Sequence, residues 1–154
     1  MIRQDLFSVE FSPGQQYMQS KTILLVDDNA VQAMIRRTIL ERNGYVAITV
    51  LQPARALDHL RNNDPHSSVD LVITDHIMPG MSGSTFSKEV RTIWPTIPIL
   101  VISGMEDACV EYEGLNVEFR VKPLQPEILL QSVQQLIGIP EPSVNSTALA
   151  VVTA

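Results

Sequence analysis

The chain contains very little cysteine and no long hydrophobic run. Cys109 is the single cysteine among 154 residues, which excludes an intrachain disulfide and is consistent with a reducing compartment. The N-terminal segment MIRQDLFSVEFSPGQQYMQS lacks the continuous apolar stretch of a signal peptide. The apolar C-terminal ALAVVTA is far shorter than the roughly 20 residues of a membrane-spanning helix. Composition therefore predicts a cytoplasmic protein that does not enter a membrane.

Basic residues are also scarce. The sequence has 11 Lys and Arg against 17 Asp and Glu, which gives a net charge of −6 and a pI near 4.9. Binding of nucleic acid through its phosphates needs Lys and Arg, so this balance argues against a nucleic-acid partner. The hydrophobic fraction of 45% and the charged fraction of 18% are typical of a globular protein, and the length suits one domain.

Short apolar runs alternate with segments of helical periodicity along the chain. We expect buried strands at 22–26, 45–50, 69–74, 99–103 and 116–121. Strands that alternate with helices predict an α/β fold with a parallel sheet and right-handed crossovers. The predicted domain covers 21–138, between a flexible N-terminal extension over 1–20 and a C-terminal tail over 139–154.

The segments between these runs have apolar residues three and four positions apart, as helices do. The first such segment places Val31, Met34, Ile35 and Thr38 on one face. The later helices are marked by Ala56, Leu57 and Leu60, by Phe86, Val90 and Ile93, and by Leu129, Leu130, Val133, Leu136 and Ile137.

Polar residues stand at the ends of the apolar runs. Asp27 and Asp28 close ILLVDD, Asp75 closes LVITD, Ser103 closes PILVIS, and Lys122 follows EFRV. The carboxyl ends of parallel strands meet at one edge of a sheet, where ligands bind in such folds. Three carboxylates, a hydroxyl and an ammonium at this edge are suited to holding Mg²⁺ and accepting a phosphoryl group.

A purely structural interpretation exists for each of these residues alone. Asp28 could act only as the cap of the following helix, because Asp is favoured at helix N-termini. Ser103 alone could be a turn residue, and Lys122 alone an ordinary surface lysine. Capping does not explain the set, since an ammonium cannot accept a hydrogen bond from a helix N-terminus.

Four segments together resemble a known family. ILLVDDN, LVITDHIMPGMSG, ILVISG and FRVKP are similar to the receiver (CheY-like) domain of two-component response regulators. The resemblance covers about 21–138, roughly three quarters of the chain. It implies a flavodoxin-like three-layer sandwich, in which a parallel five-stranded sheet of order 2-1-3-4-5 has helices on both faces.

The resemblance also implies a metal and phosphoryl site. Asp75 is then the phosphoacceptor and a Mg²⁺ ligand. Asp28 binds Mg²⁺ directly, Asp27 helps through water, and the backbone carbonyl of Ile77 is a further ligand. A partner histidine kinase or phosphotransfer protein supplies the phosphoryl group.

Further residues take catalytic and switching roles by the same resemblance, with Lys122 and Ser103 as catalytic residues and Ser103 and Phe119 as switch residues. Ser103 contacts the phosphoryl group, Lys122 pairs with it, and Phe119 occupies the aromatic switch position. The Lys122–Pro123 peptide is similar to the cis bond that is frequent in the family. The expected output is binding of an unidentified downstream protein, or relay of the phosphoryl group.

The segment between Ser103 and Lys122 is shorter than in typical receivers. SGMEDACVEYEGLNVEFRVKP leaves little room for a full fourth helix, so we expect this helix to be shortened. In the family, that helix often contributes to the output and homodimer face. The short segment therefore puts this mode of output in doubt.

Three residues near the site carry expectations of their own. His76 is interpreted as a surface residue that shapes access of a kinase or phosphatase, because the donor histidine belongs to a partner. Ile77 and Met105 stand where side chains cover an acyl phosphate. Both are apolar and cannot orient an attacking water, so we expect slow self-dephosphorylation.

Two other functions remain open from the residues. Haloacid-dehalogenase-type phosphatases also use an aspartyl nucleophile with Mg²⁺. Their nucleophile lies in a D-x-D pattern at the first strand, where this chain has Asp27, Asp28 and Asn29. A binding module that signals without phosphorylation is the other alternative. We expect a signalling domain rather than an enzyme.

Overall fold

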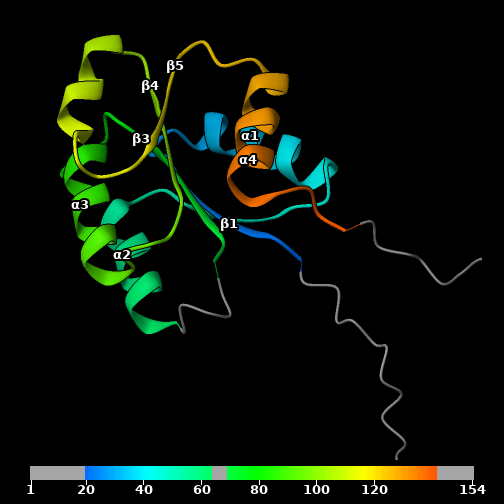
Figure 1. Ribbon diagram of the computed structural model, residues 1–154, viewed down its shortest axis with the longest axis horizontal. Coiled ribbons are helices and arrows are strands. Elements are labelled where there is room, and N and C mark those ends of the chain that lie inside the picture. The colour runs from blue at the N-terminus through cyan, green and yellow to red at the C-terminus, as the bar shows by residue number, and fades with distance from the viewer. Residues whose placement is uncertain (1–19, 64–68, 142–154) are drawn as a thin grey trace, which may run out of the picture.

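Five parallel strands form one sheet, with helices on both of its faces (Figure 1). The computed structural model describes residues 20–63 and 69–141. The strands are ordered β2-β1-β3-β4-β5, which confirms the predicted flavodoxin-like fold. The elements are β1 Thr22–Val26, α1 Ala30–Arg42, β2 Val46–Val50, α2 Pro53–Asn62, β3 Leu71–Asp75, α3 Gly83–Ile93, β4 Ile99–Ser103, the 3₁₀ helix η1 Glu106–Tyr112, β5 Glu118–Val121 and α4 Pro126–Ile137.

The regions predicted to flank the domain lie mostly outside this description. Of the expected extension over 1–20 and tail over 139–154, only residues 20 and 139–141 are described. Within the described ranges, no helix combines the length and the apolar character needed to cross a bilayer.

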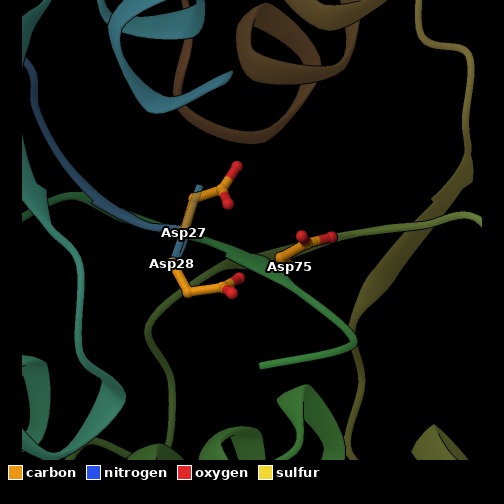
Figure 2. A group of neighbouring side chains, drawn as sticks. All are labelled: Asp27, Asp28 and Asp75. Atoms are coloured by element: carbon orange, nitrogen blue, oxygen red, sulfur yellow. The ribbon is translucent and has the colours of Figure 1, made fainter. Parts of the chain in front are cut away.

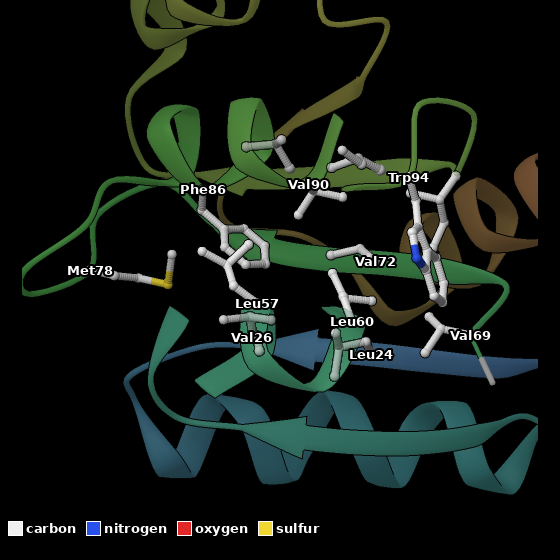
Figure 3. Close-up of a cluster of buried hydrophobic side chains, with 14 of the residues drawn as sticks. Leu24, Val26, Leu57, Leu60, Val69, Val72, Met78, Phe86, Val90 and Trp94 are labelled. Atoms are coloured by element: carbon white, nitrogen blue, oxygen red, sulfur yellow. The ribbon is translucent and has the colours of Figure 1, made fainter. Parts of the chain in front are cut away.

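Alternate residues of each central strand point to opposite faces of the sheet, as the pleat requires. On β1, Leu24 and Val26 join the core under α2 and α3, whereas Ile23 and Leu25 join the core under α1 and α4. Figure 3 shows the first of these cores, in which Phe86 and other side chains of α2 and α3 pack on the sheet. Because both faces are covered, β1, β3 and β4 are apolar almost throughout.

The N-terminus of α1 is capped by Asn29 and not by Asp28. The Asn29 side chain accepts hydrogen bonds from the backbone N–H groups of Val31 and Gln32, at 3.1 and 3.0 Å. Capping was the structural alternative for Asp28, and it is wrong because the next residue fills that role. The carboxylate of Asp28 is therefore left exposed at the sheet edge.

The apolar face predicted for α1 turns out to face solvent. Val31 and Met34 are each 68% exposed and Ile35 is 55% exposed. The helix packs on the sheet through Ala33 and Leu40 instead. The apolar spacing of the first three residues thus marks a surface and not a core contact.

The segment expected to be a shortened fourth helix forms only the 3₁₀ helix η1. Its buried residues are Ala108 and Tyr112, and Tyr112 joins the core under α3. On the way to β5, Arg91 of α3 donates hydrogen bonds to the carbonyls of Leu115 and Asn116, at 2.7 and 2.9 Å. These contacts hold the connection against α3 although it lacks a full helix.

Candidate functional site

Three carboxylates meet at the carboxyl edge of the sheet (Figure 2). Asp27 and Asp28 follow the last residue of β1, and Asp75 ends β3, the neighbouring strand. Each carboxylate offers one oxygen to a group in which all these oxygens lie within 4.8 Å of one another. Asp27 and Asp75 are buried and Asp28 is exposed, so the cluster is open to solvent on one side.

Asp27 is held by two donors in a fully buried position. Its Oδ1 accepts a hydrogen bond from the backbone N–H of Asn29 at 2.9 Å, and its Oδ2 pairs with Nη1 of Arg36 at 2.6 Å. Burial raises the pKa of the Asp27 carboxyl above its usual value, although the contacts with Asn29 and Arg36 act in the opposite direction. A nearby cation would favour the ionised form of this carboxyl.

Lys122 lies beside Asp75, as the strand-end argument predicted. Its Nζ is 2.8 Å from Oδ1 of Asp75 and also donates to Oε1 of Gln32 at 3.2 Å. The Lys122–Pro123 peptide bond is cis, as the resemblance implied. An ammonium and a carboxylate at this distance form a charge-assisted pair that compensates part of the negative charge of the cluster.

The donor set of the cluster fits a small, hard cation. Mg²⁺ takes oxygen ligands and usually keeps several waters, so two or three carboxylate oxygens from the protein are enough. The close oxygens of Asp27, Asp28 and Asp75 would supply these ligands, and the exposure of Asp28 would leave room for water. Ile77 follows in the β3–α3 loop, where its side chain is 64% exposed.

Ser103 ends β4, the strand on the other side of β3 from β1. It is fully buried, and its hydroxyl donates to the backbone carbonyl of Met105 at 3.2 Å and accepts from the Met105 N–H at 3.0 Å. The hydroxyl therefore binds the loop that follows β4. Phe119 on β5 is partly buried and packs against Tyr112, with ring centroids 5.6 Å apart.

The expectation for His76 was wrong. His76 is only 5% exposed, so its side chain is not available at the surface. Its Nδ1 lies 2.6 Å from the hydroxyl of Tyr112 on η1. The ring turns beneath η1, and that segment covers it. Among the apolar side chains of the neighbouring loops, Ile77 and, at 45%, Met105 are exposed.

Arg36 and Gln32 are site residues that sequence reasoning missed. Arg36 pairs with Asp27, and Gln32 accepts from Lys122, so α1 contacts the acidic cluster through two side chains. A signal for Arg36 is present in hindsight. It stands three residues after Ala33 and four before Leu40, and these are the two buried residues of α1, so a cation interrupts the true core stripe.

The fold and the site together define a class. The flavodoxin-like sheet carries acidic side chains and a lysine at its carboxyl edge. This is the edge at which such sheets bind ligands, and the side chains are suited to a metal ion. A family model described as the response regulator receiver domain matches residues 23–134. The chain belongs to this family of two-component signalling domains.

Individual proteins show the same similarity. The chain is 36% identical to the hydrogenase transcriptional regulatory protein HoxA of Cupriavidus necator over 121 residues, covering 75% of this chain and 24% of HoxA. It is 29% identical to the chemotaxis protein CheY of Bacillus subtilis over 120 residues, covering 75% of this chain and 97% of CheY. It therefore spans only about a quarter of HoxA but nearly all of that CheY.

Solved structures agree with the fold. The structure of CheY4 of Vibrio cholerae has a TM-score of 0.69 at 27% identity, covering 77% of this chain and 99% of CheY4. A putative response regulator from Chloroflexus aurantiacus has a TM-score of 0.70 at 27% identity, covering 77% of this chain and 98% of the other. Receiver domains are signalling domains and not classical enzymes.

Proposed function

We propose that this chain is a phosphorylation-dependent receiver, which accepts a phosphoryl group on Asp75 from a partner histidine kinase or phosphotransfer protein. The observation that carries the proposal is the arrangement around Asp75. Nζ of Lys122 lies 2.8 Å from its Oδ1, and oxygens of Asp27, Asp28 and Asp75 fall within 4.8 Å of one another. Phosphoryl transfer depends mainly on positioning and charge neutralisation, which these residues supply.

The proposed transfer needs no reactant beyond the phosphodonor and a proton from solvent. A carboxylate oxygen of Asp75 forms a bond to phosphorus while the phosphorus–nitrogen bond of the donor phosphohistidine breaks, and the freed imidazole nitrogen takes up a proton. Lys122 and the backbone N–H of His76, which donates to Oδ1 of Asp75 at 3.2 Å, orient the acceptor. Asp27, Asp28, Asp75 and the Ile77 carbonyl would hold Mg²⁺, which would supply positive charge for the phosphoryl oxygens.

The switch follows from the residues next to Asp75. In the proposed phosphorylated state, the Ser103 hydroxyl leaves Met105 and donates to the phosphoryl group, and Phe119 moves into the vacated space. Phosphorylation thereby shifts a two-state equilibrium that a downstream protein reads, or the phosphoryl group passes to another protein. We place this activity in the cytoplasm, in accord with the composition and the single cysteine.

The surface beside the site supports a protein phosphodonor. The exposed apolar side chains of Val31, Met34 and Ile35 lie on α1, the helix that also carries Gln32. A groove of about 580 Å³ between α1 and α4 includes Ile35 and reaches Lys122. Apolar surface that is continuous with a reactive site is typical of a protein contact.

Acetyl phosphate and Mg²⁺ test the proposal directly. We expect intact-mass spectrometry to detect one phosphoryl adduct, and Asp75→Asn to abolish it while leaving the fold intact by circular dichroism. The adduct should outlast the removal of the donor by minutes, because Ile77 and Met105 are apolar and cannot direct water to it. Multiple turnover of phosphate esters would instead indicate a phosphatase, and no adduct at all would indicate a phosphorylation-independent binding module.

Mg²⁺ binding is testable without phosphorylation. We expect Mg²⁺ at a hundredfold excess over its dissociation constant to raise the free energy of unfolding by about 2.7 kcal/mol. Asp28→Asn should weaken Mg²⁺ binding on the order of tenfold or more, because it removes a charged ligand from an exposed position. Thermal unfolding over a Mg²⁺ series measures both effects.

A control separates the metal site from general loss of acidic charge. Asp58→Asn removes a carboxylate that is 70% exposed on α2 and is only 3.7 Å from Arg61. This variant should respond to Mg²⁺ as the parent protein does. An equal weakening in both variants would count against Asp28 as a ligand.

A further inference from the structure

The buried ring of His76 lies next to the phosphoacceptor, and the proposed transfer does not use this polar ring. The ring is 5% exposed and lies against Tyr112, with centroids 5.6 Å apart in an edge-to-face arrangement. Nδ1 is 2.6 Å from the Tyr112 hydroxyl, and Nε2 is 3.8 Å from Oε1 of Glu111. Both ring nitrogens therefore face residues of η1.

The direction of these contacts follows from their surroundings. Burial, with the nearby charges of Glu111 and Asp75, raises the pKa of the Tyr112 phenol, which therefore stays a hydroxyl. Its O–H donates to Nδ1 in the His76 tautomer that carries its proton on Nε2, on the side of the Glu111 carboxylate. The other oxygen of Glu111 accepts from the Ser84 hydroxyl at 2.8 Å. The chain of contacts thus runs from η1 through His76 to the first turn of α3.

The backbone of the same residue contacts the phosphoacceptor. The His76 N–H donates to Oδ1 of Asp75 at 3.2 Å, and the His76 carbonyl accepts from the N–H of Gly83 at 2.7 Å. The carbonyl of the next residue, Ile77, is the proposed metal ligand. The His76 ring is thus attached to backbone groups that surround the phosphoryl site.

We propose that Tyr112 and Glu111 are positioning residues for phosphoryl acceptance at Asp75, and that they act by holding the His76 ring. This inference rests on the proposed function. The Tyr112 ring also packs against Phe119, 5.6 Å between centroids, so the residue that holds the acceptor loop touches the proposed switch residue as well. The short η1 thereby stays connected to the site although it lacks the turns of a full helix.

Tyr112→Phe is the decisive variant, because it removes one hydroxyl and keeps the packed ring. A buried Nδ1 without its donor relaxes the His76 ring, and we expect the rate of Asp75 phosphorylation by acetyl phosphate to fall on the order of threefold to tenfold. The ¹⁵N shifts of the His76 ring should show a protonated Nε2 and an accepting Nδ1 in the parent protein. Both shifts should move in Tyr112→Phe.

Tyr45→Phe is the matched control. The Tyr45 hydroxyl is likewise a buried donor, to the carbonyl of Gly138 at 2.8 Å, but Tyr45 belongs to the core under α1 and α4. It should lose stability and keep the parent rate and the parent His76 shifts. Glu111→Gln, at an exposed position on η1, should move the Nε2 shift and lower the rate in the same direction as Tyr112→Phe.

The inference and the proposed function fail in different ways. A parent protein that takes up no phosphoryl group would refute the proposed function. A parent that is phosphorylated, with Tyr112→Phe reacting at the same rate, would refute the positioning role. An equal loss of rate in Tyr45→Phe would refute it too, because the effect would then be one of general stability. In a His76→Leu background, Tyr112→Phe should have no further effect on the rate, and a full additional loss would overturn action through His76.

Discussion

Gly83→Ala is expected to destabilise the protein by about 3 kcal/mol or more, although alanine is the better helix former. Gly83 begins α3, directly under the phosphoacceptor loop. A Cβ at this position would lie 2.6 Å from the Tyr112 hydroxyl and 2.9 Å from the Cα of His76, and closer still to the carbonyl oxygen of Asp75. Two of these neighbours are backbone atoms, which cannot move aside without displacing the loop.

The direction of the stability change in Gly83→Ala distinguishes helix propensity from steric exclusion. Helix propensity alone would make alanine about 1 kcal/mol more favourable than glycine inside a helix. Steric exclusion should override that gain, because the clash involves the acceptor residue itself. Urea unfolding of Gly83→Ala measures the outcome through the denaturation midpoint. We also expect Tyr112 to be displaced, which near-ultraviolet circular dichroism would report.

Gly104→Ala is the control for a glycine near the site. A Cβ there would meet no atom within 4 Å, so its effect on the midpoint should be small. A stabilised Gly83→Ala protein would mean that the loop can move away from α3 at low cost. The close packing of η1, the loop and α3 would then be less rigid than the contacts indicate.

The acidic cluster was predictable from the sequence because it depends on topology and not on side-chain detail. Parallel strands end at one edge, so residues after β1, at the end of β3 and after β5 share that edge whatever packs around them. Asp27, Asp28, Asp75 and Lys122 could therefore be placed together from the apolar runs. The strand order itself came only with the family resemblance.

The exposed face of α1 could not be predicted in the same way. Val31, Met34 and Ile35 have the spacing of a core stripe, and spacing alone does not distinguish a face that packs on a sheet from a face that is left open. The helix packs on the sheet through Ala33 and Leu40 instead. Two buried residues are too few to mark the core-facing side of a helix in the sequence.

The burial of His76 depends on a contact across 36 positions of sequence. Tyr112 is a buried residue of η1, and local sequence patterns do not encode its contact with the His76 ring. The same limit applies to Arg36, whose partner Asp27 is nine residues away across the start of α1. Both contacts join helices and strands that the sequence predicts, but tertiary packing decides which side chains become partners.

Arg36→Met is expected to lower the free energy of unfolding by about 3 kcal/mol when divalent ions are absent. The pair between Arg36 and Asp27 is nearly buried, with side-chain exposures of 11% and 0% and a separation of 2.6 Å. Methionine keeps much of the aliphatic packing of arginine but leaves the Asp27 charge without its partner. The loss should therefore report the charge and not the volume.

The loss should depend on pH and on Mg²⁺. Burial already raises the pKa of Asp27 in the folded protein, so the native state binds its proton more tightly than the unfolded chain does. Ionisation of Asp27 therefore lowers the free energy of unfolding as the pH rises above the usual pKa of an aspartate. Removal of Arg36 increases that loss. The Arg36→Met loss should shrink toward acid pH, where Asp27 is protonated. Excess Mg²⁺ at neutral pH should also restore most of the stability, because a divalent cation replaces the missing positive charge.

Arg37→Met is the matched control on the next position of the same helix. Arg37 pairs with Glu41 at 2.8 Å, but the two side chains are 51% and 44% exposed, so the expected loss is only about 0.3–0.5 kcal/mol and does not depend on Mg²⁺. Urea unfolding with EDTA and with MgCl₂ compares the two variants. If Arg36→Met lost the same stability in both buffers, its guanidinium would be acting through packing alone. A loss that Mg²⁺ reverses would identify Arg36 as a cation that balances Asp27 until the metal binds.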